Sequence, residues 1–372
     1  MEENVRLAHQ AITKCLNVQE GENVWIQSWN HTTDLASEIA LVCQEKGAQP
    51  FITLNDETYW IRSLEGASKN FLQTLPSTKA AALEQTDAFI FMIGPRKPID
   101  WNKIPPEKHE LANIWYLESN KYLDSWRKIA RKRLVRMLGI EYCIATREMA
   151  SSLGLDYNEW RKIMLDGCLA DQRQITERAV KLTKIFRECS KVNVETSFGT
   201  SLKFKLAGRE PIIGDSIVTA EDAGKGIVKF LPSGFVEVAP DEDSAEGVVV
   251  YNLPVYIHGG EKIEGLTLHF HRGRIVEYSA RGGVECFEDY LKSSQGDAGK
   301  FGFFGLGLNP CLKSCFRQDD KVLGGVTIGI GANEDKGGKN RTVRGRGWWA
   351  CMNEATVMFD GKTVLEDKQL MV

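Results

Sequence analysis

Two groups of side chains in this chain could do chemistry. His269 and His271 are separated by one residue, so an extended strand would present both imidazoles on one face. The glycine turn after His258 could bring a third imidazole close, which would give three nitrogen ligands for a transition metal. No carboxylate completes this set, and solvated strand histidines are the simpler interpretation.

A pair of arginines and one glutamate offer different chemistry. Arg344 and Arg346 could clamp a carboxylate or phosphate, because guanidinium groups match the geometry of these anions. The alternative is a solvated strand end in a glycine-rich turn. Glu237 could act as a general base in a pocket, although an exposed glutamate is the commoner outcome.

Five stretches in the second half of the chain carry a resemblance to known proteins. They are residues 199–209 (GTSLKFKLAGR), 231–240 (LPSGFVEVAP), 302–310 (GFFGLGLNP), 320–331 (DKVLGGVTIGIG) and 337–346 (GGKNRTVRGR). In order and spacing they resemble the catalytic half of the aminopeptidase T/aminopeptidase S metallopeptidases. The resemblance implies a two-domain fold with a cleft between the domains, and a homodimer.

The residues that would hold metal in that family are replaced here. The resemblance puts the family's two metal-binding glutamates at Phe235 and Phe303, and a ligand histidine at Thr327. It puts a further His and Asp at Arg344 and Arg346. Phenyl rings, a hydroxyl and guanidinium cations do not supply the nitrogen, sulfur or carboxylate donors that such metals need. We therefore expect no metal and no other cofactor at this position.

The resemblance also defines a candidate substrate site: Phe235, Phe303, Thr327, Arg344 and Arg346. The two phenylalanines would make one corner apolar and able to stack a ring, or they would plug the cavity. The arginines would make the site suitable for an anion instead of a cation. The catalytic residue is unknown, with Glu237 as the candidate.

Composition limits the classes of partner. Formal net charge is −3 and the sequence pI is about 6.2, so no excess of positive charge favours nucleic acid or an anionic membrane. No apolar run approaches the length of a membrane span, and the start of the chain lacks a signal-like apolar core. Nine scattered cysteines are typical of reduced thiols. We expect a cytoplasmic protein with a small-molecule or peptide-like ligand.

The patterns predict an N-terminal α/β domain (1–190) with a largely parallel sheet, followed by a strand-rich α+β domain (191–372). Periodicity predicts helices over 5–15, 33–46 and 157–190, the last bridging the two domains. Buried strands are expected over 23–28, 49–54, 88–94, 114–118 and 140–146. After residue 191, short strands separated by glycine turns predict an antiparallel arrangement.

Three functions remain open from the sequence. We favour a repurposed, metal-independent enzyme that acts on a small anionic or amino-acid/peptide-like substrate. The second is a non-catalytic pseudoenzyme or binding partner of another enzyme. The third is a metal-dependent aminopeptidase. A branch of the family resembles the iron-dependent 2,5-dihydroxypyridine dioxygenase, which shows that the scaffold accepts other chemistry, but its ligands are also missing here.

Overall fold

The computed structural model describes residues 2–112, 121–256, 262–343 and 347–371. The chain forms two compact units. Unit 1 contains residues 1–172 and 216–233, and unit 2 contains residues 173–215 and 234–372. These units differ from the expected division at residue 190, because the segment 216–233 supplies a strand to the sheet of unit 1.

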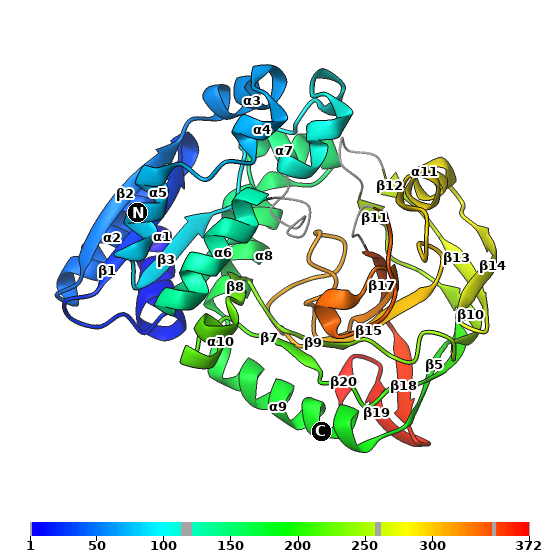
Figure 1. The fold of residues 1–372 in the computed structure, drawn as a ribbon. Helices are drawn as coiled ribbons and strands as arrows, with labels where there is room; N and C mark the ends of the chain where they lie inside the picture. Colours follow the sequence, from blue (N-terminus) through cyan, green and yellow to red (C-terminus); the bar gives the residue numbers. More distant parts are fainter. Residues whose placement is uncertain (1, 113–120, 257–261, 344–346, 372) are drawn as a thin grey trace. The chain divides into compact units, whose positions relative to one another are not determined.

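Unit 1 is built on a parallel sheet of five strands in the order β2-β1-β3-β4-β8 (Figure 1). The strands are β1 (Asn23–Trp29), β2 (Gln49–Asn55), β3 (Ala88–Met92), β4 (Arg136–Ile140) and β8 (Val228–Leu231). The central β3 is apolar throughout (AFIFM) and largely buried, as expected for a strand covered on both faces.

Helices surround this sheet. They are α1 (Glu2–His9), α2 (Thr33–Glu45), α3 (Glu57–Gly66), α4 (Lys69–Leu72), α5 (Ser77–Glu84), α6 (Lys121–Arg133), α7 (Arg147–Leu153), α8 (Tyr157–Leu169) and α10 (Ala220–Lys225). On one face, Trp126 of α6 packs at ring-centroid distances of 5.1 Å from Trp25 and 4.9 Å from Phe89. α2 contacts β1 and β2 and ends before Gly47, whose φ of 75° suits a glycine after a helix.

Two expected elements end differently from the prediction. The strand expected over 140–146 is wrong, because β4 covers Arg136–Ile140 and Glu141–Ile144 form a 3₁₀ turn. Tyr142 and Cys143 are buried within the turn, so this apolar run is buried without an extended strand. The helix expected over 157–190 is two helices, because the backbone of Ala170 (φ −53°, ψ 152°) leaves the helical region. The strand expected over 114–118 lies outside the described residues.

Unit 2 holds two antiparallel sheets and a two-stranded ribbon. The larger sheet has the order β14-β13-β10-β6-β5-β18-β19-β20, and the smaller has the order β17-β16-β15-β9-β7 (Figure 1).

The larger sheet contains β5 (Lys191–Thr196), β6 (Ser201–Lys205), β10 (Glu246–Val250), β13 (Thr267–His271), β14 (Arg274–Ser279), β18 (Ala355–Phe359), β19 (Lys362–Glu366) and β20 (Gln369–Leu370). The smaller contains β7 (Ile212–Gly214), β9 (Phe235–Val238), β15 (Phe301–Gly307), β16 (Val326–Gly331) and β17 (Gly347–Met352). β11 (Val255–Tyr256), β12 (Lys262–Ile263), α9 (Gln172–Glu188) and α11 (Val284–Ser294) complete the unit.

Aromatic side chains join the two sheets of unit 2. Phe304 of β15 lies 5.2 Å from the ring of Phe204 and 6.1 Å from that of Phe359, both in the larger sheet. Phe301 lies 5.0 Å from Phe204, and Phe186 of α9 closes the cluster 5.0 Å from Phe359. One face of the smaller sheet is therefore committed to the core, and its other face is left for a site.

The predicted fold class is confirmed: an α/β unit with a parallel sheet and an antiparallel, strand-rich unit with two helices. All nine cysteines are free thiols. Across the residues that the structure describes, no helix combines the length and the apolar character needed to cross a membrane.

A buried ion pair in unit 2 makes the first testable prediction. Arg209 donates to both carboxylate oxygens of Glu242 at 2.7 and 2.9 Å, and these side chains are only 13% and 5% exposed. We expect Arg209→Ala to lower the free energy of unfolding by about 3–5 kcal/mol, because it leaves a buried carboxylate without its partner. The exposed pair Arg187–Glu210 is the control, where Arg187→Ala should cost less than about 1 kcal/mol in urea unfolding. Equal losses would contradict the prediction.

The same pair predicts a dependence on pH. Burial alone would raise the pKa of Glu242, but hydrogen bonds from Arg209 and from the Lys339 N–H outweigh it and hold the pKa at about 2, below its ordinary value of 4.5. The stabilisation is therefore fully present above pH 4.5 and is lost as the pH falls from there towards 2. Unfolding measured across this range should show a smaller loss in Arg209→Ala than in the unchanged chain.

Candidate functional site

The structure brings four predicted site residues onto one face of the smaller sheet of unit 2. Glu237 of β9 pairs directly with Gly305 of β15, which pairs with Thr327 of β16. Directly paired residues in antiparallel strands point to the same side, as do residues two apart on one strand. Phe235 and Phe303 therefore share this side with Glu237 and Thr327. We call it the site face.

The remaining predicted residues lie on the larger sheet or outside the described residues. Arg344, Arg346 and His258 lie outside the described residues. His269 and His271 are on β13 of the larger sheet, and His271 Nδ1 lies 3.1 Å from a carboxylate oxygen of exposed Glu246. This contact of His271 is typical of a surface pair.

Glycines opposite the aromatic residues make room for the rings. A Cβ on Gly214 would lie 2.2 Å from the Phe235 ring, and a Cβ on Gly329 would lie 2.2 Å from the Phe303 ring. Each ring therefore lies flat over the neighbouring strand. Phe303 is only 5% exposed, so it fills the position where the resemblance places a ligand carboxylate.

Two residues that the sequence analysis did not single out belong to the same face. Trp349 and Cys351 of β17 pair with Gly329 and Thr327 respectively. Trp349 is 50% exposed, and its ring centroid lies 6.1 Å from that of Phe303. The exposed aromatic surface at this site therefore comes from Trp349, while Phe303 lies beneath it.

Lys336 is a third residue that the sequence analysis missed, and it supplies a cation. Its ammonium lies 3.3 Å from Glu237 Oε1, 2.7 Å from Asp335 Oδ2 and 4.7 Å above the centre of the Phe303 ring. The Lys336 side chain is 13% exposed and that of Glu237 is 18% exposed. The site face thus holds an ion pair packed against an aromatic ring.

Asparagine side chains fasten the segment that carries Lys336. Asn333 Nδ2 donates to the Gly302 carbonyl at 2.7 Å, and Asn340 Nδ2 donates to the Phe301 carbonyl at 2.8 Å. Asn333 Oδ1 accepts from the Asn340 N–H at 2.9 Å, which closes the segment on itself. Both asparagines are buried, so the 3₁₀ turn Glu334–Lys336 is held beside β15.

Burial and charge set the protonation of the site. Burial raises the pKa of Glu237 above its ordinary value, and the attraction of the Lys336 ammonium only partly opposes this. Burial would lower the pKa of Lys336, but the carboxylates of Glu237 and Asp335 outweigh it and raise the pKa, so the amine stays protonated. A permanently charged ammonium can donate hydrogen bonds but cannot act as a nucleophile.

Thr327 and Cys351 do not form a nucleophilic pair. The Thr327 hydroxyl lies 3.4 Å from Cys351 Sγ, and both residues are buried. Burial raises the pKa of the Cys351 thiol well above its ordinary value, with Asp320 adding to the shift. The thiolate is the reactive form of cysteine, so this thiol is inert at neutral pH.

The donor set of the site face is poor for a metal. Phe235 and Phe303 have no donor atoms, and the Thr327 hydroxyl is a weak ligand compared with imidazole or carboxylate. Within the described ranges, no three His, Cys, Asp or Glu side chains are grouped in a way that could hold a metal ion. Among the described residues, the site face therefore offers few donor atoms for a transition metal.

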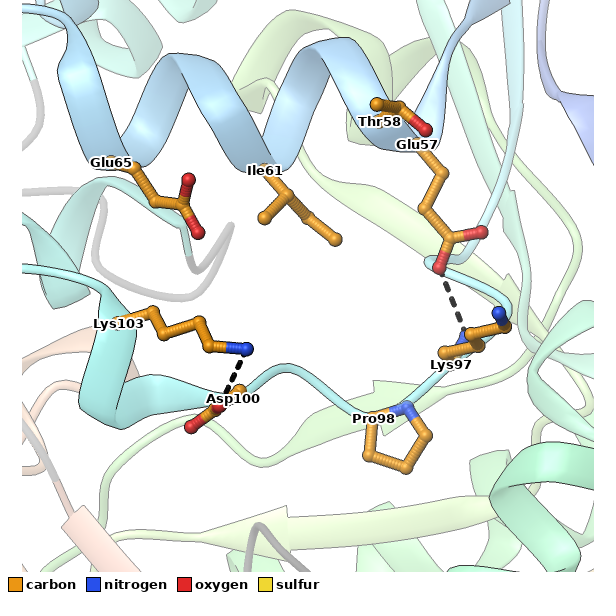
Figure 2. A pocket seen from close by; sticks show the side chains of 8 residues that line it. All are labelled: Glu57, Thr58, Ile61, Glu65, Lys97, Pro98, Asp100 and Lys103. Carbon is orange, nitrogen blue, oxygen red and sulfur yellow. Dashed lines mark hydrogen bonds and ion pairs between the residues drawn. The ribbon is translucent and has the colours of Figure 1, made fainter.

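Unit 1 contains a surface pocket of about 280 Å³ with mixed charge. Figure 2 shows α3 on one side, with Glu57, Ile61 and Glu65, facing a loop that carries Lys97 and Lys103. The Lys97 N–H donates to Glu57 at 3.1 Å, and Lys103 pairs with Asp100 at 3.2 Å. The pocket contains none of the predicted site residues.

The ring geometry of the site face can be tested by adding one methyl group. Gly329→Ala should lower the free energy of unfolding by about 1–3 kcal/mol, because the new Cβ collides with the Phe303 ring. Gly299→Ala is the matched control, since its Cβ would meet nothing closer than 3.8 Å. Combining Gly329→Ala with Phe303→Ala should cost less than the sum of the two single changes. Strictly additive losses would show that the ring lies elsewhere.

Comparisons with known proteins place this geometry in context. Over 98 residues the chain is 31% identical to aminopeptidase AmpS of Bacillus subtilis, and the match covers 26% of this chain and 23% of that protein. The chain thus matches about a quarter of the length of this relative.

Solved structures share the whole fold. Wild-type AmpT from Thermus thermophilus superposes with a TM-score of 0.74 at 19% identity, covering 100% of this chain and 99% of the other. The 2,5-dihydroxypyridine dioxygenase of Pseudomonas putida KT2440 superposes with a TM-score of 0.64 at 16% identity, covering 99% and 97%. Since the model of the thermophilic metalloprotease family (M29) matches residues 2–310, this chain belongs to that family.

Proposed function

We propose that this chain is a repurposed M29-family enzyme that works without a metal, on a small amino-acid- or peptide-like substrate with an anionic group. The observation that carries the proposal is the ion pair of Glu237 and Lys336, which lies among Phe235, Phe303 and Thr327 on the site face. This acid–base pair lies beside Phe235, Phe303 and Thr327, where the resemblance implies that other members of the family hold metal.

The charge of Lys336 supports metal independence. A divalent cation on the site face would come close to a protonated amine, and repulsion between like charges is strong where burial lowers the effective dielectric constant. Loss of the donor atoms removes the attraction, and Lys336 adds repulsion. Both effects act against a metal at this position.

Glu237 and Lys336 could divide the work of catalysis. A largely buried carboxylate with a raised pKa is suited to accept a proton from water or from a substrate group near neutral pH. The ammonium of Lys336 has three N–H donors and meets two carboxylates among the described residues. Its further donor can stabilise negative charge that develops on a bound carbonyl.

The ligand chemistry follows from the rim of the site face. Trp349 is half exposed and offers a surface for an apolar or aromatic group of the ligand. Arg344 and Arg346 directly precede β17 in the sequence, and we propose that they hold the anionic group. From the family resemblance we also propose that the protein is a cytoplasmic homodimer. Analytical sedimentation, which gives the mass in solution, would test the dimer.

A non-catalytic role is the second candidate, and a specific observation favours it. Phe303 is buried and fills one of the former ligand positions, and Lys336 engages the Glu237 carboxylate. A site closed in this way would suit a pseudoenzyme that binds another protein. Turnover distinguishes the two candidates.

A screen of aminoacyl-anilides and anionic metabolites tests the proposal. We expect turnover that a chelator leaves unchanged, and elemental analysis of the purified protein should find no stoichiometric transition metal. Hydrolysis that a chelator abolishes would instead support a metal-dependent aminopeptidase. No turnover of any compound would favour the non-catalytic candidate.

Glu237→Gln tests the general base once a substrate is known. We expect kcat to fall by about 10²–10⁴-fold with little change in KM, because the amide cannot accept the proton. In the unchanged chain, activity should rise with pH as Glu237 deprotonates. The rise should occur at a pH above the ordinary glutamate pKa of 4.5, because burial raises the pKa of Glu237. Glu246→Gln, which changes an exposed glutamate of the larger sheet, is the control and should keep full activity. Full activity in Glu237→Gln would remove this residue from the mechanism.

A further inference from the structure

The surroundings of the Lys336 ammonium have the features of a cation-binding site. Two carboxylates lie within 3.3 Å of the nitrogen, and an aromatic face lies 4.7 Å away. Carboxylates and aromatic faces are the groups with which proteins recognise ammonium ions. In this site the cation belongs to the chain itself.

The local charge explains why a cation is needed. Burial raises the pKa of Glu237, and Asp335 and Asp320 add to the shift, so the site face gathers negative charge around a largely buried carboxylate. Without Lys336, these carboxylates would repel one another across a poorly solvated space. The ammonium therefore offsets a cluster of like charges.

The position of the ammonium is built into the fold. Asn333 and Asn340 hold the segment to the backbone of β15, and the buried Phe303 ring forms the floor beneath Nζ. Lys300 offers a contrast, because its similarly buried side chain pairs with the carboxylate of exposed Asp243 at 3.0 Å. The cradle at Lys336 has three components from separate parts of the chain.

We propose that the Lys336 ammonium is the resident cation of the site face, and that the space left without it is a receptor for a small primary alkylammonium ion. The inference rests on the proposed function in one respect: the proposed loss of the metal explains why a lysine ammonium neutralises the acidic site face. Its test needs no substrate, so a failure of catalysis and a failure of this assignment are separate results.

The test is rescue of Lys336→Ala by n-propylammonium, which replaces the three methylene groups and the amine that the substitution removes. We expect the variant to melt roughly 5 °C lower than the unchanged chain. Millimolar n-propylammonium should raise its Tm in a saturable way and leave the unchanged chain unaffected. n-Propanol, which lacks the charge, and tetramethylammonium, which lacks N–H donors, should have no effect.

Matched variants identify the cradle. Lys336→Ala/Glu237→Gln should lose the rescue, and Lys300→Ala should show none. If Lys336→Ala does not fold, Lys336→Arg and Lys336→Met decide the question, because only Lys336→Arg should keep a Tm near that of the unchanged chain. Equal Tm values for these two variants, or a propylammonium effect that is absent or the same in Lys336→Ala and the unchanged chain, would overturn the proposal.

Discussion

The register in which β9, β15, β16 and β17 pair determines the whole site face. A slip of one residue in any of these strands would exchange the site residues for core residues, because alternate side chains point to opposite sides. Phe304 and its contacts with Phe204 and Phe359 prevent such a slip, since they bury the opposite face between the two sheets. The aromatic core of unit 2 therefore positions Glu237 and Thr327, although their side chains lie on the opposite face of the smaller sheet.

Glycines on the site face determine how deep the aromatic residues lie. The rings of Phe235 and Phe303 occupy space over Gly214 and Gly329 that any Cβ would fill. This pattern was visible in the sequence as glycine alternating with large apolar residues in β15 and β16. The family resemblance, and not this pattern, predicted which residues share the site, and it left open whether the rings fill the space. The 5% exposure of Phe303 shows that this ring fills it.

Local patterns predicted most of the fold, and long-range contacts account for the rest. The strands β1, β2 and β3 and the helix α2 follow from local apolar patterns, which a sequence displays directly. Segment 216–233 joins the sheet of unit 1 through β8, and no local pattern reveals that a strand pairs with a distant one. Lys336 was missed for the same reason. Its place over Phe303 depends on hydrogen bonds from Asn333 and Asn340 to β15, which span about thirty to forty residues of sequence.

The expected reversal of charge, from a site for a cation to a site for an anion, takes a different form in the structure. Two carboxylates match the single positive charge of Lys336, so the described part of the site face has no surplus of positive charge. The proposed function therefore assigns the attraction for an anion to Arg344 and Arg346. This division of roles would be useful for catalysis. Glu237 must stay negatively charged to accept a proton, and a substrate anion held at a distance from Glu237 is repelled less by that charge. Lys336 can then moderate the repulsion between Glu237 and the anionic substrate, which no residue with a neutral side chain could do.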